Sequence, residues 1–438
     1  MRKVDLPTFD LIDPDLRGLA DDLFARLRSD FFDGVGVSRE TYGPSETTAM
    51  EMIEAAAEAH GLETSWDAAR NLRVRLPGRR AAAAGTVGTG SHMDSVPQGG
   101  NYDGAAGVVA GLLALIAAKA RGGADHALEV YALRGEESAW FGGPCYFGSR
   151  ALFGLLGPQD LASKHRRRDA TLADQMAAAG ADMAVIEARR PLRQASDFRA
   201  WFELHIEQGP ILVAREKPVG IVTGIRGNVR HRRVVCRGQA AHSGAVPRWM
   251  RHDAVLAMSE LLMRLDEHWR VLLAWGEDLV FTTGIVETDP NEHAVSRVPG
   301  LVTFAVEYRS QDAKTLENFG KLLETECEKI GRERGVEFDL GEAVFTKPAK
   351  MSSALTGLAE TQAEEFGVPY EIMASGAGHD TAVFSNAGIP ATMIFVRNDK
   401  GSHNPDEMMD MNDFFCGAEV LARTMIAAAN GEGGESAQ

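Results

Sequence analysis

One short stretch of the chain gathers residue types that can bind a metal ion. His92, Asp94 and Asp103 lie in a glycine-rich segment, residues 90–104. One ring nitrogen of His92 can ligate a metal while Asp94, two residues later, holds the other. The Asp103 carboxylate can point to the same place. A glycine-rich turn with an aspartate capping a helix also explains this segment taken alone, so residues elsewhere must decide its function.

The same residue types follow three more predicted strands. Glu136 and Glu137 come after the strand predicted at 126–133. Side chains alternate along an extended chain, so one of these carboxylates can bind a metal while the other faces a substrate. His205 ends a buried strand, where it is either a hydrogen-bonded core residue or a third ligand. His403 lies in a polar loop after another buried strand.

Together these side chains form the ligand set of a metal hydrolase. Imidazoles mixed with carboxylates suit Zn²⁺, or Mn²⁺ and its neighbours. Three histidines and two acids fit two ions about 3.5 Å apart, joined by a bridging carboxylate. The remaining carboxylate can then act as a general base. Neither a Ser-His-Asp motif nor a phosphate-binding glycine loop competes with this interpretation.

The elements that must position these residues belong to an α/β fold. The run 86–89 predicts the end of a buried strand, and 105–120 predicts a helix. In open α/β sheets, ligands bind between a strand end and the following helix. We therefore expect a metal-binding domain with a mixed, mostly parallel sheet.

The pattern changes from residue 218 onwards. A β-β-α-β-β-α order predicts an inserted α+β domain with a four-stranded sheet and two helices. Its predicted strands and helices are 220–224, 230–237, 253–269, 279–286, 301–308 and 313–334. The predicted domains are 1–217 and 336–438, which together form the catalytic domain, and 218–335, a lid or dimerisation domain.

Composition limits the partners of the protein. The chain has 438 residues, with 62 acidic against 46 basic side chains and a formal charge of −16. This argues against nucleic acid and against an anionic membrane surface. The N-terminus lacks a signal pattern, no apolar run is long enough to span a bilayer, and the four cysteines lack a C-x-x-C spacing. These features predict a cytoplasmic protein with free thiols. The basic run 164–168 predicts a solvated face.

Six motifs together resemble one known family. The chain resembles the carbamoylase branch of the dinuclear-metal aminoacylase and carboxypeptidase superfamily. That branch holds N-carbamoyl-L-amino-acid amidohydrolases, β-ureidopropionases and allantoate amidohydrolases. The resemblance covers nearly the whole chain, and the motifs are residues 90–104, 136–137, 205–210, 241–244, 375–380 and 401–405.

This resemblance implies a role for each residue of the metal site. His92, Asp103 and His205 would hold one ion, with Asp103 bridging to a second ion. The residues implied to complete the second ion are Glu137 and His403. The resemblance makes Glu136 the base that takes a proton from the attacking water and returns it to the leaving nitrogen. Asp94 would orient His92.

The resemblance also implies substrate contacts. Arg309 would bind a substrate carboxylate through a bidentate fork. His242, in the inserted domain, would polarise the scissile carbonyl, in this family usually across a homodimer interface. The residues expected to bind substrate are Gln208, Ser296, Arg309, Gly378 and His379.

Three positions depart from the family pattern. Ser296 stands where the family usually has Asn, Trp140 where it has Arg, and Arg248 where it has Met. None of the three is an expected metal ligand. Ser296 and Trp140 are expected to line the substrate pocket, and Trp140 would add an apolar surface there. The departures therefore affect which substrate is used and leave the chemistry unchanged.

The expected function is hydrolysis of a C–N bond in an N-carbamoyl or N-acyl L-amino acid, or in a related ureide. Two divalent ions per chain, Zn or Mn with Co or Ni as alternatives, would serve a small substrate that carries a carboxylate. On the same site, an amidase of amino-acid conjugates or a hydrolytic deaminase of an aromatic carboxylate is the alternative. A non-catalytic binding protein is a different class, and it does not need five ligands together with Glu136.

Overall fold

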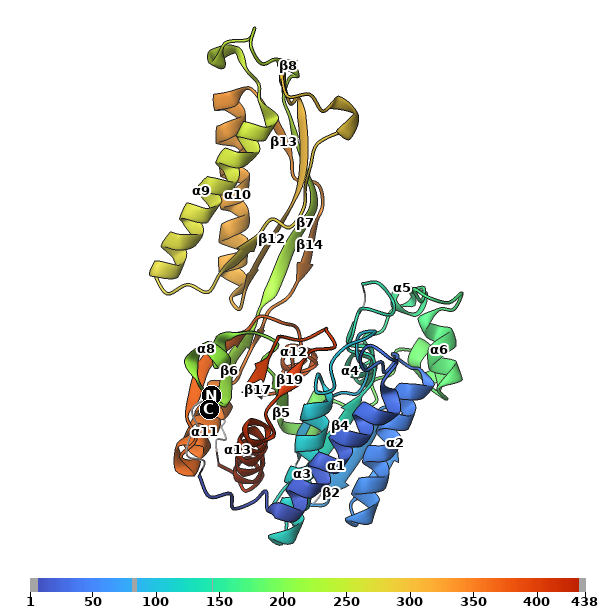
Figure 1. The fold of residues 1–438 in the computed structure, drawn as a ribbon. Helices are drawn as coiled ribbons and strands as arrows, with labels where there is room; N and C mark the ends of the chain where they lie inside the picture. The colour runs from blue at the N-terminus through green and yellow to red at the C-terminus, as the bar shows by residue number, and fades with distance from the viewer. Residues whose placement is uncertain (1–6, 81–84, 144, 433–438) are drawn as a thin grey trace. The chain divides into compact units, whose positions relative to one another are not determined.

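The chain folds into two compact units in the computed structural model, which describes residues 7–80, 85–143 and 145–432 (Figure 1). Unit 1 combines residues 1–224 with 351–438, and unit 2 is formed by residues 225–350. The inserted unit therefore interrupts the sequence of unit 1.

A mixed sheet forms the centre of unit 1, and its strands run in the order β1-β2-β4-β3-β5-β17-β6, with β16 paired to β6. The four central strands are parallel, whereas β2 and β6 flank them in the antiparallel direction. The strands of this sheet are β1 (Glu63–Trp66), β2 (Leu72–Leu76), β3 (Thr86–His92), β4 (Ala127–Leu133), β5 (Phe198–Ile206), β6 (Val219–Ile225), β16 (Tyr370–Ser375) and β17 (Ala391–Val396), with the short β15 (Ala349–Lys350) after β6. The short β18 (Asn398–Asp399) and β19 (Met408–Met409) form a separate two-stranded sheet. The predicted mixed α/β sheet is confirmed, with its parallel strands in the centre.

Helices cover this sheet. The helices of unit 1 are α1 (Pro14–Phe31), α2 (Pro44–Ala59), α3 (Ala105–Ala120), α4 (Phe147–Leu152), α5 (Pro158–Leu161), α6 (Leu172–Ala178), α7 (Met183–Glu187), α8 (Ile211–Arg215), α11 (Ser353–Phe366), α12 (Thr381–Asn386) and α13 (Met411–Ala429). Helices α1, α2, α11 and α13 share one large apolar core with α3 and the central strands. A smaller cluster joins α4 and α12 to β4 and β5.

Helix α3 lies close to the sheet, and this closeness positions the preceding segment, residues 90–104, which carries predicted metal ligands. It is apolar on nearly all sides and almost entirely buried. A side chain at Gly107 would collide with the Leu204 carbonyl oxygen, and one at Gly111 would press on Thr89 and Val130. The small residues let α3 approach β3, β4 and β5. The segment that precedes α3, residues 90–104, therefore lies next to the carboxyl ends of these strands.

Unit 2 is an antiparallel sheet packed against two long helices (Figure 1). Its strands are β7 (Gly227–Arg237), β8 (Ala241–His242), β9 (Val280–Thr282), β10 (Val286–Glu287), β11 (Arg297–Val298), β12 (Leu301–Ser310), β13 (Glu337–Asp339) and β14 (Ala343–Thr346), and its helices are α9 (Ala254–Ala274) and α10 (Ala313–Arg334). Strands β7 and β12 form the long central pair. Alternate residues of β12 are buried, as expected for a strand with one face on a core.

The inserted unit differs from the prediction in its strands and its boundaries. The run predicted as strand 220–224 is β6, which pairs with β17 in the sheet of unit 1. The run 279–286 splits into β9 and β10, and β13 and β14 add to β7, so the sheet has six strands where four were predicted. The observed unit is therefore 225–350 where 218–335 was predicted. A short apolar run predicts a strand but does not specify its sheet.

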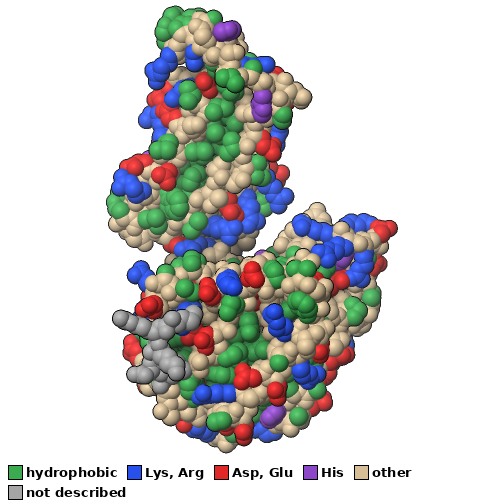
Figure 2. Space-filling view, viewed as in Figure 1, with side chains coloured by type: hydrophobic (Ala, Val, Ile, Leu, Met, Phe, Trp, Pro, Cys, Tyr) green, Lys and Arg blue, Asp and Glu red, His purple; other side chains and the backbone are tan. Residues whose placement is uncertain are grey.

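The surface carries both signs of charge. Figure 2 shows acidic and basic side chains interspersed on the visible face of each unit, with a basic group near α5 and α6. The exposed side chains Lys164, Arg166, Arg167 and Arg168 lie between these two helices in the sequence. Within the described part of the chain, no helix has the length and hydrophobicity needed to cross a membrane.

Candidate metal centre

The predicted ligands meet at one edge of the sheet of unit 1. His92 ends β3, Glu136 and Glu137 follow β4, His205 lies near the end of β5, and His403 follows β17. These four strands are adjacent and parallel. Because parallel strands end at the same edge, side chains from four separate parts of the sequence converge there.

Asp103 belongs to two groups of ligand atoms. One group is His92, Asp103 and His205, and the other is Asp103, Glu137 and His403, with the atoms of each group within 4.8 Å of one another. Asp103 Oδ1 lies 3.3 Å from His92 Nε2 and 3.2 Å from His205 Nε2. Asp103 Oδ2 lies 3.5 Å from His403 Nε2. Its two oxygens therefore face different groups.

The donor set fits two divalent cations. Asp103 Oδ1 is buried, faces the Nε2 atoms of His92 and His205, and accepts no hydrogen bond of normal geometry from the described residues. A buried carboxylate is costly unless a cation or a proton neutralises it. Nitrogen and oxygen donors from histidine and carboxylate side chains are the ligands that Zn²⁺ and its neighbours prefer. We infer that the residues present suit a dinuclear site bridged by Asp103.

Two histidine rings are turned so that Nε2 faces Asp103. His92 Nδ1 lies 3.0 Å from the Asp94 carbonyl oxygen and 3.2 Å from Asp94 Oδ1. His205 Nδ1 lies 2.9 Å from the Ile206 carbonyl oxygen. A hydrogen bond at one ring nitrogen fixes the tautomer and leaves the other nitrogen for a ligand role.

Asp94 also holds the glutamate pair. Its Oδ1 accepts the Glu136 N–H at 3.0 Å, and its Oδ2 accepts the Glu137 N–H at 3.2 Å and the Thr41 hydroxyl. The side chain is fully buried. One carboxylate therefore fixes the position of His92 relative to both glutamates.

The two glutamates differ in their contacts. Glu137 Oε1 lies 3.1 Å from His403 Nε2, and this hydrogen bond raises the pKa of His403 to about 9. Glu136 lies with His92 and Glu137 in a third group of close ligand atoms. Burial raises the pKa of the Glu136 carboxyl well above its ordinary value. A carboxyl with a raised pKa is suited to taking up a proton.

Gly104 joins Asp103 to α3 in a conformation that requires glycine. Its φ is +68°, and a side chain there would collide with the carbonyl oxygen and ring of His92. Glycine adopts a positive φ at little cost because it has no Cβ. The turn at Gly104 therefore lets Asp103 and His92 lie close together.

Gln208 lies beside the bridging carboxylate. Its Nε2 donates to Asp103 Oδ2 at 2.8 Å, and its Oε1 is buried with no hydrogen-bond partner in the described ranges. The residue has a φ of +60°, held by a hydrogen bond from its N–H to Asn398 Oδ1. The Gln208 amide is therefore next to the predicted metal ligands, with a free acceptor.

His379 and Gly378 lie behind His205. The His379 ring is buried, its centroid is 4.4 Å from that of His205, and its Nε2 lies 3.0 Å from Ser375 Oγ. Burial lowers the pKa of His379 well below its ordinary value. A side chain at Gly378 would collide with the Tyr146 hydroxyl. Their expected substrate contacts stay a prediction.

Trp140 holds the metal-binding segment to the basic run. Only 4 % of it is exposed, and its Nε1 donates to the Ser95 carbonyl oxygen at 2.7 Å. Its ring stacks on His165, and the Arg167 guanidinium lies 5.2 Å from the ring centroid. The predicted solvated run therefore packs partly against the protein. The expected apolar contribution of Trp140 to a substrate pocket remains a prediction.

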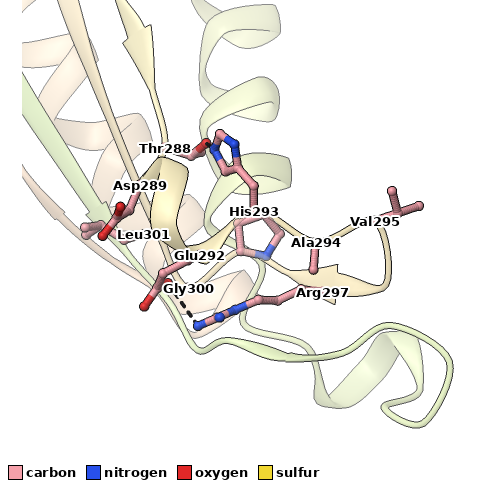
Figure 3. Close-up of a pocket in the computed structure, with 10 residues that line it drawn as sticks. Thr288, Asp289, Glu292, His293, Ala294, Val295, Arg297, Gly300 and Leu301 are labelled. Carbon is pink, nitrogen blue, oxygen red and sulfur yellow. Dashed lines mark hydrogen bonds and ion pairs between the residues drawn. The ribbon is translucent and has the colours of Figure 1, made fainter.

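The remaining predicted residues belong to unit 2. His242 is exposed on β8 and pairs with Arg297 of β11. The carbonyl oxygen of exposed Ser296 accepts the Ser243 N–H at 2.8 Å. Next to them is a cavity of about 320 Å³. Its wall includes Glu292 and Arg297, which form an ion pair of 3.0 Å (Figure 3).

Arg309 lies in the six-stranded sheet of unit 2, apart from the two-stranded sheet of β8 and β11. It is on β12 opposite Asn228 of β7, and its Nη2 pairs with Glu307 Oε1 at 3.0 Å. The residues that the structure brings together are His92, Asp94, Asp103, Glu136, Glu137, His205, Gln208, His379 and His403.

Two residues near the metal site were not predicted. Arg39 is fully buried and donates to carbonyl oxygens of the segment 90–104, and buried Glu407 accepts N–H groups of the same segment. Glu407 lies in the polar loop that carries His403, which is a weak signal in the sequence. Arg39 follows an ordinary glycine-containing turn and carries no such signal.

Comparisons with known proteins identify the family of the chain. Residues 88–427 match Peptidase family M20/M25/M40. The chain is 34% identical over 397 residues to an allantoate amidohydrolase of Escherichia coli, covering 90% of this chain and 93% of that protein. It is 33% identical over 402 residues to an N-carbamoyl-L-amino acid amidohydrolase of Geobacillus stearothermophilus, covering 91% and 94%.

Solved structures with a similar fold belong to the same group of proteins. The crystal structure of an amidase of the hydantoinase/carbamoylase family from Burkholderia multivorans matches with a TM-score of 0.82 and 29% identity, covering 97% of this chain and all of that one. The chain belongs to Peptidase family M20/M25/M40, and within it resembles the hydantoinase/carbamoylase amidases.

Proposed function

We propose that this protein is a cytoplasmic, homodimeric amidohydrolase that requires two divalent ions per chain, Zn or Mn with Co or Ni as alternatives. It would cleave a C–N bond of an N-carbamoyl or N-acyl L-amino acid, or of a related ureide such as allantoate. The observation that carries this proposal is the division of Asp103 between two ligand groups. A bridging carboxylate with imidazole and carboxylate partners is the arrangement that a dinuclear hydrolase needs.

In this proposal, His92, Asp103 and His205 would hold one ion, and Asp103, Glu137 and His403 would hold the other. The bound ions would supply Lewis-acid activation of water and of the scissile carbonyl. Glu136 takes the proton of the attacking water and later delivers it to the leaving nitrogen. Asp94 holds His92 and both glutamates in the positions that this proton transfer requires.

Gln208 offers a substrate contact within unit 1. Its unpartnered Oε1 is an acceptor beside Asp103 and is suited to an N–H group of a ureide or amide. Gly378 and His379 are proposed to border the substrate on the His205 side. Arg309 is proposed to bind the substrate carboxylate, exchanging its contact with Glu307 for a bidentate fork.

The distance between two unit 2 residues supports a dimer. His242 lies beyond the Leu301 end of β12, whereas Arg309 lies near the other end. Eight residue steps along a strand span roughly 27 Å. One small substrate cannot touch both residues of the same chain. We therefore propose that His242 reaches the site of a second chain and stabilises the developing oxyanion there, with Ser296 beside it.

The test combines metal removal with a substrate panel. Protein dialysed against a chelator should be inactive, and added Mn²⁺ or Zn²⁺ should restore hydrolysis. Elemental analysis at saturating metal should find close to two ions per chain. The panel comprises allantoate and N-carbamoyl, N-acetyl and aromatic N-acyl L-amino acids, with ammonia and amine release as readouts. Full activity of the metal-free protein would contradict the proposal.

A further inference from the structure

A buried arginine holds the segment that carries His92, Asp94 and Asp103. Arg39 is fully buried, and its Nε donates to the Met93 carbonyl oxygen at 2.7 Å. Its Nη2 donates to the Asp103 carbonyl oxygen at 3.4 Å. The guanidinium therefore connects the two ends of this segment through their backbone.

A buried glutamate holds the same segment from a distant part of the chain. Only 4 % of Glu407 is exposed. Its Oε1 accepts the Tyr102 N–H at 2.8 Å and the Asp103 N–H at 3.3 Å. Its Oε2 accepts the Ser402 hydroxyl at 2.7 Å, and that hydroxyl also contacts Asp103 Oδ2. A side chain at Gly100 would collide with the Glu407 carboxylate, so the segment leaves room for it.

The two side chains act on opposite sides of one residue. Glu407 binds the N–H of Asp103, and Arg39 binds its carbonyl oxygen. The orientation of this backbone sets where the Asp103 carboxylate can point. A carboxylate shared by two ions must aim one oxygen at each, so it tolerates less rotation than a ligand of a single ion.

Packing alone does not account for Arg39. The hydrogen bonds of its guanidinium go to carbonyl oxygens, and Nη1 has no partner among the described residues. A buried charge that lacks a close ion pair costs free energy that an apolar side chain would not. The cost is offset if the residue places groups that function needs.

We propose that Arg39 and Glu407 are positioning residues for the bridging carboxylate of the metal site. They form a clamp on the backbone of Asp103 that keeps its two oxygens directed at the two ligand groups. This inference rests on the proposed function, because it presumes that the site binds divalent metal.

Charge and positioning predict opposite results for Arg39. A cation next to the site repels metal ions, so its charge alone would make Arg39→Met bind metal more tightly. Loss of the clamp makes the same variant bind metal more weakly, by roughly 10–100-fold, as for other residues that orient ligands. Arg39→Lys keeps the charge with a single donor site and should fall between Arg39→Met and the wild type.

Two variants of Glu407 also distinguish the effect of charge from the effect of positioning. Glu407→Gln removes the charge but keeps an acceptor oxygen for the N–H groups of Tyr102 and Asp103. Glu407→Ala removes both. The clamp predicts that Glu407→Gln retains most of the metal affinity, whereas Glu407→Ala loses roughly 10–100-fold.

Two matched controls lie elsewhere in unit 1. Glu419 is a buried glutamate that accepts the backbone N–H groups of Asp10, Leu11 and Ile12, so Glu419→Ala removes a similar clamp. Arg193 binds Glu129 and Asp197 near the start of β5, and Arg193→Met removes a similar guanidinium. Both controls should lower thermal stability and leave metal affinity unchanged.

The experiment titrates full-length, metal-free protein with Mn²⁺ or Zn²⁺ in a calorimeter and records thermal unfolding of each metal-free variant. Weaker metal binding in Arg39→Met and Glu407→Ala, with wild-type affinity in both controls, is the expected result. Tighter binding in Arg39→Met, or equal loss in Glu407→Gln and Glu407→Ala, overturns the clamp. If Arg39→Met does not fold, the metal affinities of Arg39→Lys, Glu407→Gln and Glu407→Ala test the clamp in its place.

The same titration shows whether the proposed function has failed or only the proposed role of Arg39 and Glu407. A wild-type protein that takes up no divalent ion defeats the proposed function. A wild-type protein that binds two ions, together with clamp variants that bind them equally well, defeats only the role of Arg39 and Glu407.

Discussion

The candidate residues of unit 1 and unit 2 are held in very different ways. His92, Asp103 and His205 are buried, and both rings are fixed by hydrogen bonds to the protein. His242 is exposed on the two-stranded sheet of β8 and β11, and exposed Ser296 directly precedes β11. Metal binding needs ligands fixed before the ion arrives. In the proposed function, a substrate and a second chain would supply the surroundings that the exposed His242 and Ser296 lack.

The largest effect is expected for Glu136, in the buried site of unit 1. Glu136→Gln keeps the shape of the side chain but cannot accept a proton, so kcat should fall by roughly 10²–10⁴-fold. Metal content should hardly change. Glu137→Gln should instead lose metal, because it disrupts the group that contains His403. Activity assays with elemental analysis check both variants.

A reversed result would reassign the glutamate pair. Metal loss in Glu136→Gln with retained metal in Glu137→Gln would make Glu136 the ligand and Glu137 the base. The contact between Glu137 and His403 would then have another role.

The next largest effect is expected for His242, and it tests whether unit 2 acts on the site of another chain. His242→Ala should lower kcat by roughly 10²–10³-fold, as expected for loss of one oxyanion donor. Glu136→Gln and His242→Ala proteins, mixed and allowed to exchange subunits, form heterodimers in which one site carries both lesions and the other carries neither. Random pairing should therefore restore about a quarter of the sites.

Subunit exchange must be measured independently, for example with differently tagged chains. If heterodimers form and the mixture stays at the activity of the separate mutants, His242 acts within its own chain or has no part in the reaction. Unit 2 would then lack a role in a shared site.

The smallest effect concerns Arg309. Arg309→Lys keeps the charge but loses the bidentate fork, so KM should rise by about tenfold with little change in kcat. Esters or amides that mask the substrate carboxylate should be poor substrates of the wild type. Steady-state kinetics on free and masked acids check this, and equal rates on both would reject the proposed contact.

Sequence reasoning could name candidate metal ligands because their chemistry resides in their side chains, and the structure brings these side chains together. Histidines and carboxylates after apolar runs are visible in the sequence, and parallel strands end at one edge of a sheet. Arg39 and Glu407 were not found because they bind backbone atoms, which every residue has. Their contacts with the Asp103 backbone span 64 and 304 positions, and no local pattern reports such a pairing.

The positions of individual helices and strands could be predicted from the sequence, but the sheet that each strand joins could not. Helix α3 has the predicted bounds, since its apolar run is long and follows a clear turn. The run 220–224 was assigned to the inserted domain, but it pairs with β17. Strand propensity gives no information on the partner, because pairing depends on contacts across more than 150 residues.

The place of β17 in the sheet has a consequence for the order of folding. This strand, residues 391–396, lies between β5 and β6, and its paired residues there, such as Trp201 and Val222, precede it by 190 and 171 positions. On the ribosome, unit 2 is complete while β5 still lacks one neighbour, and His403 emerges last of the metal ligands. A central strand that arrives late leaves apolar edges exposed during synthesis. Truncation before residue 391 should therefore produce aggregation-prone protein rather than a smaller enzyme.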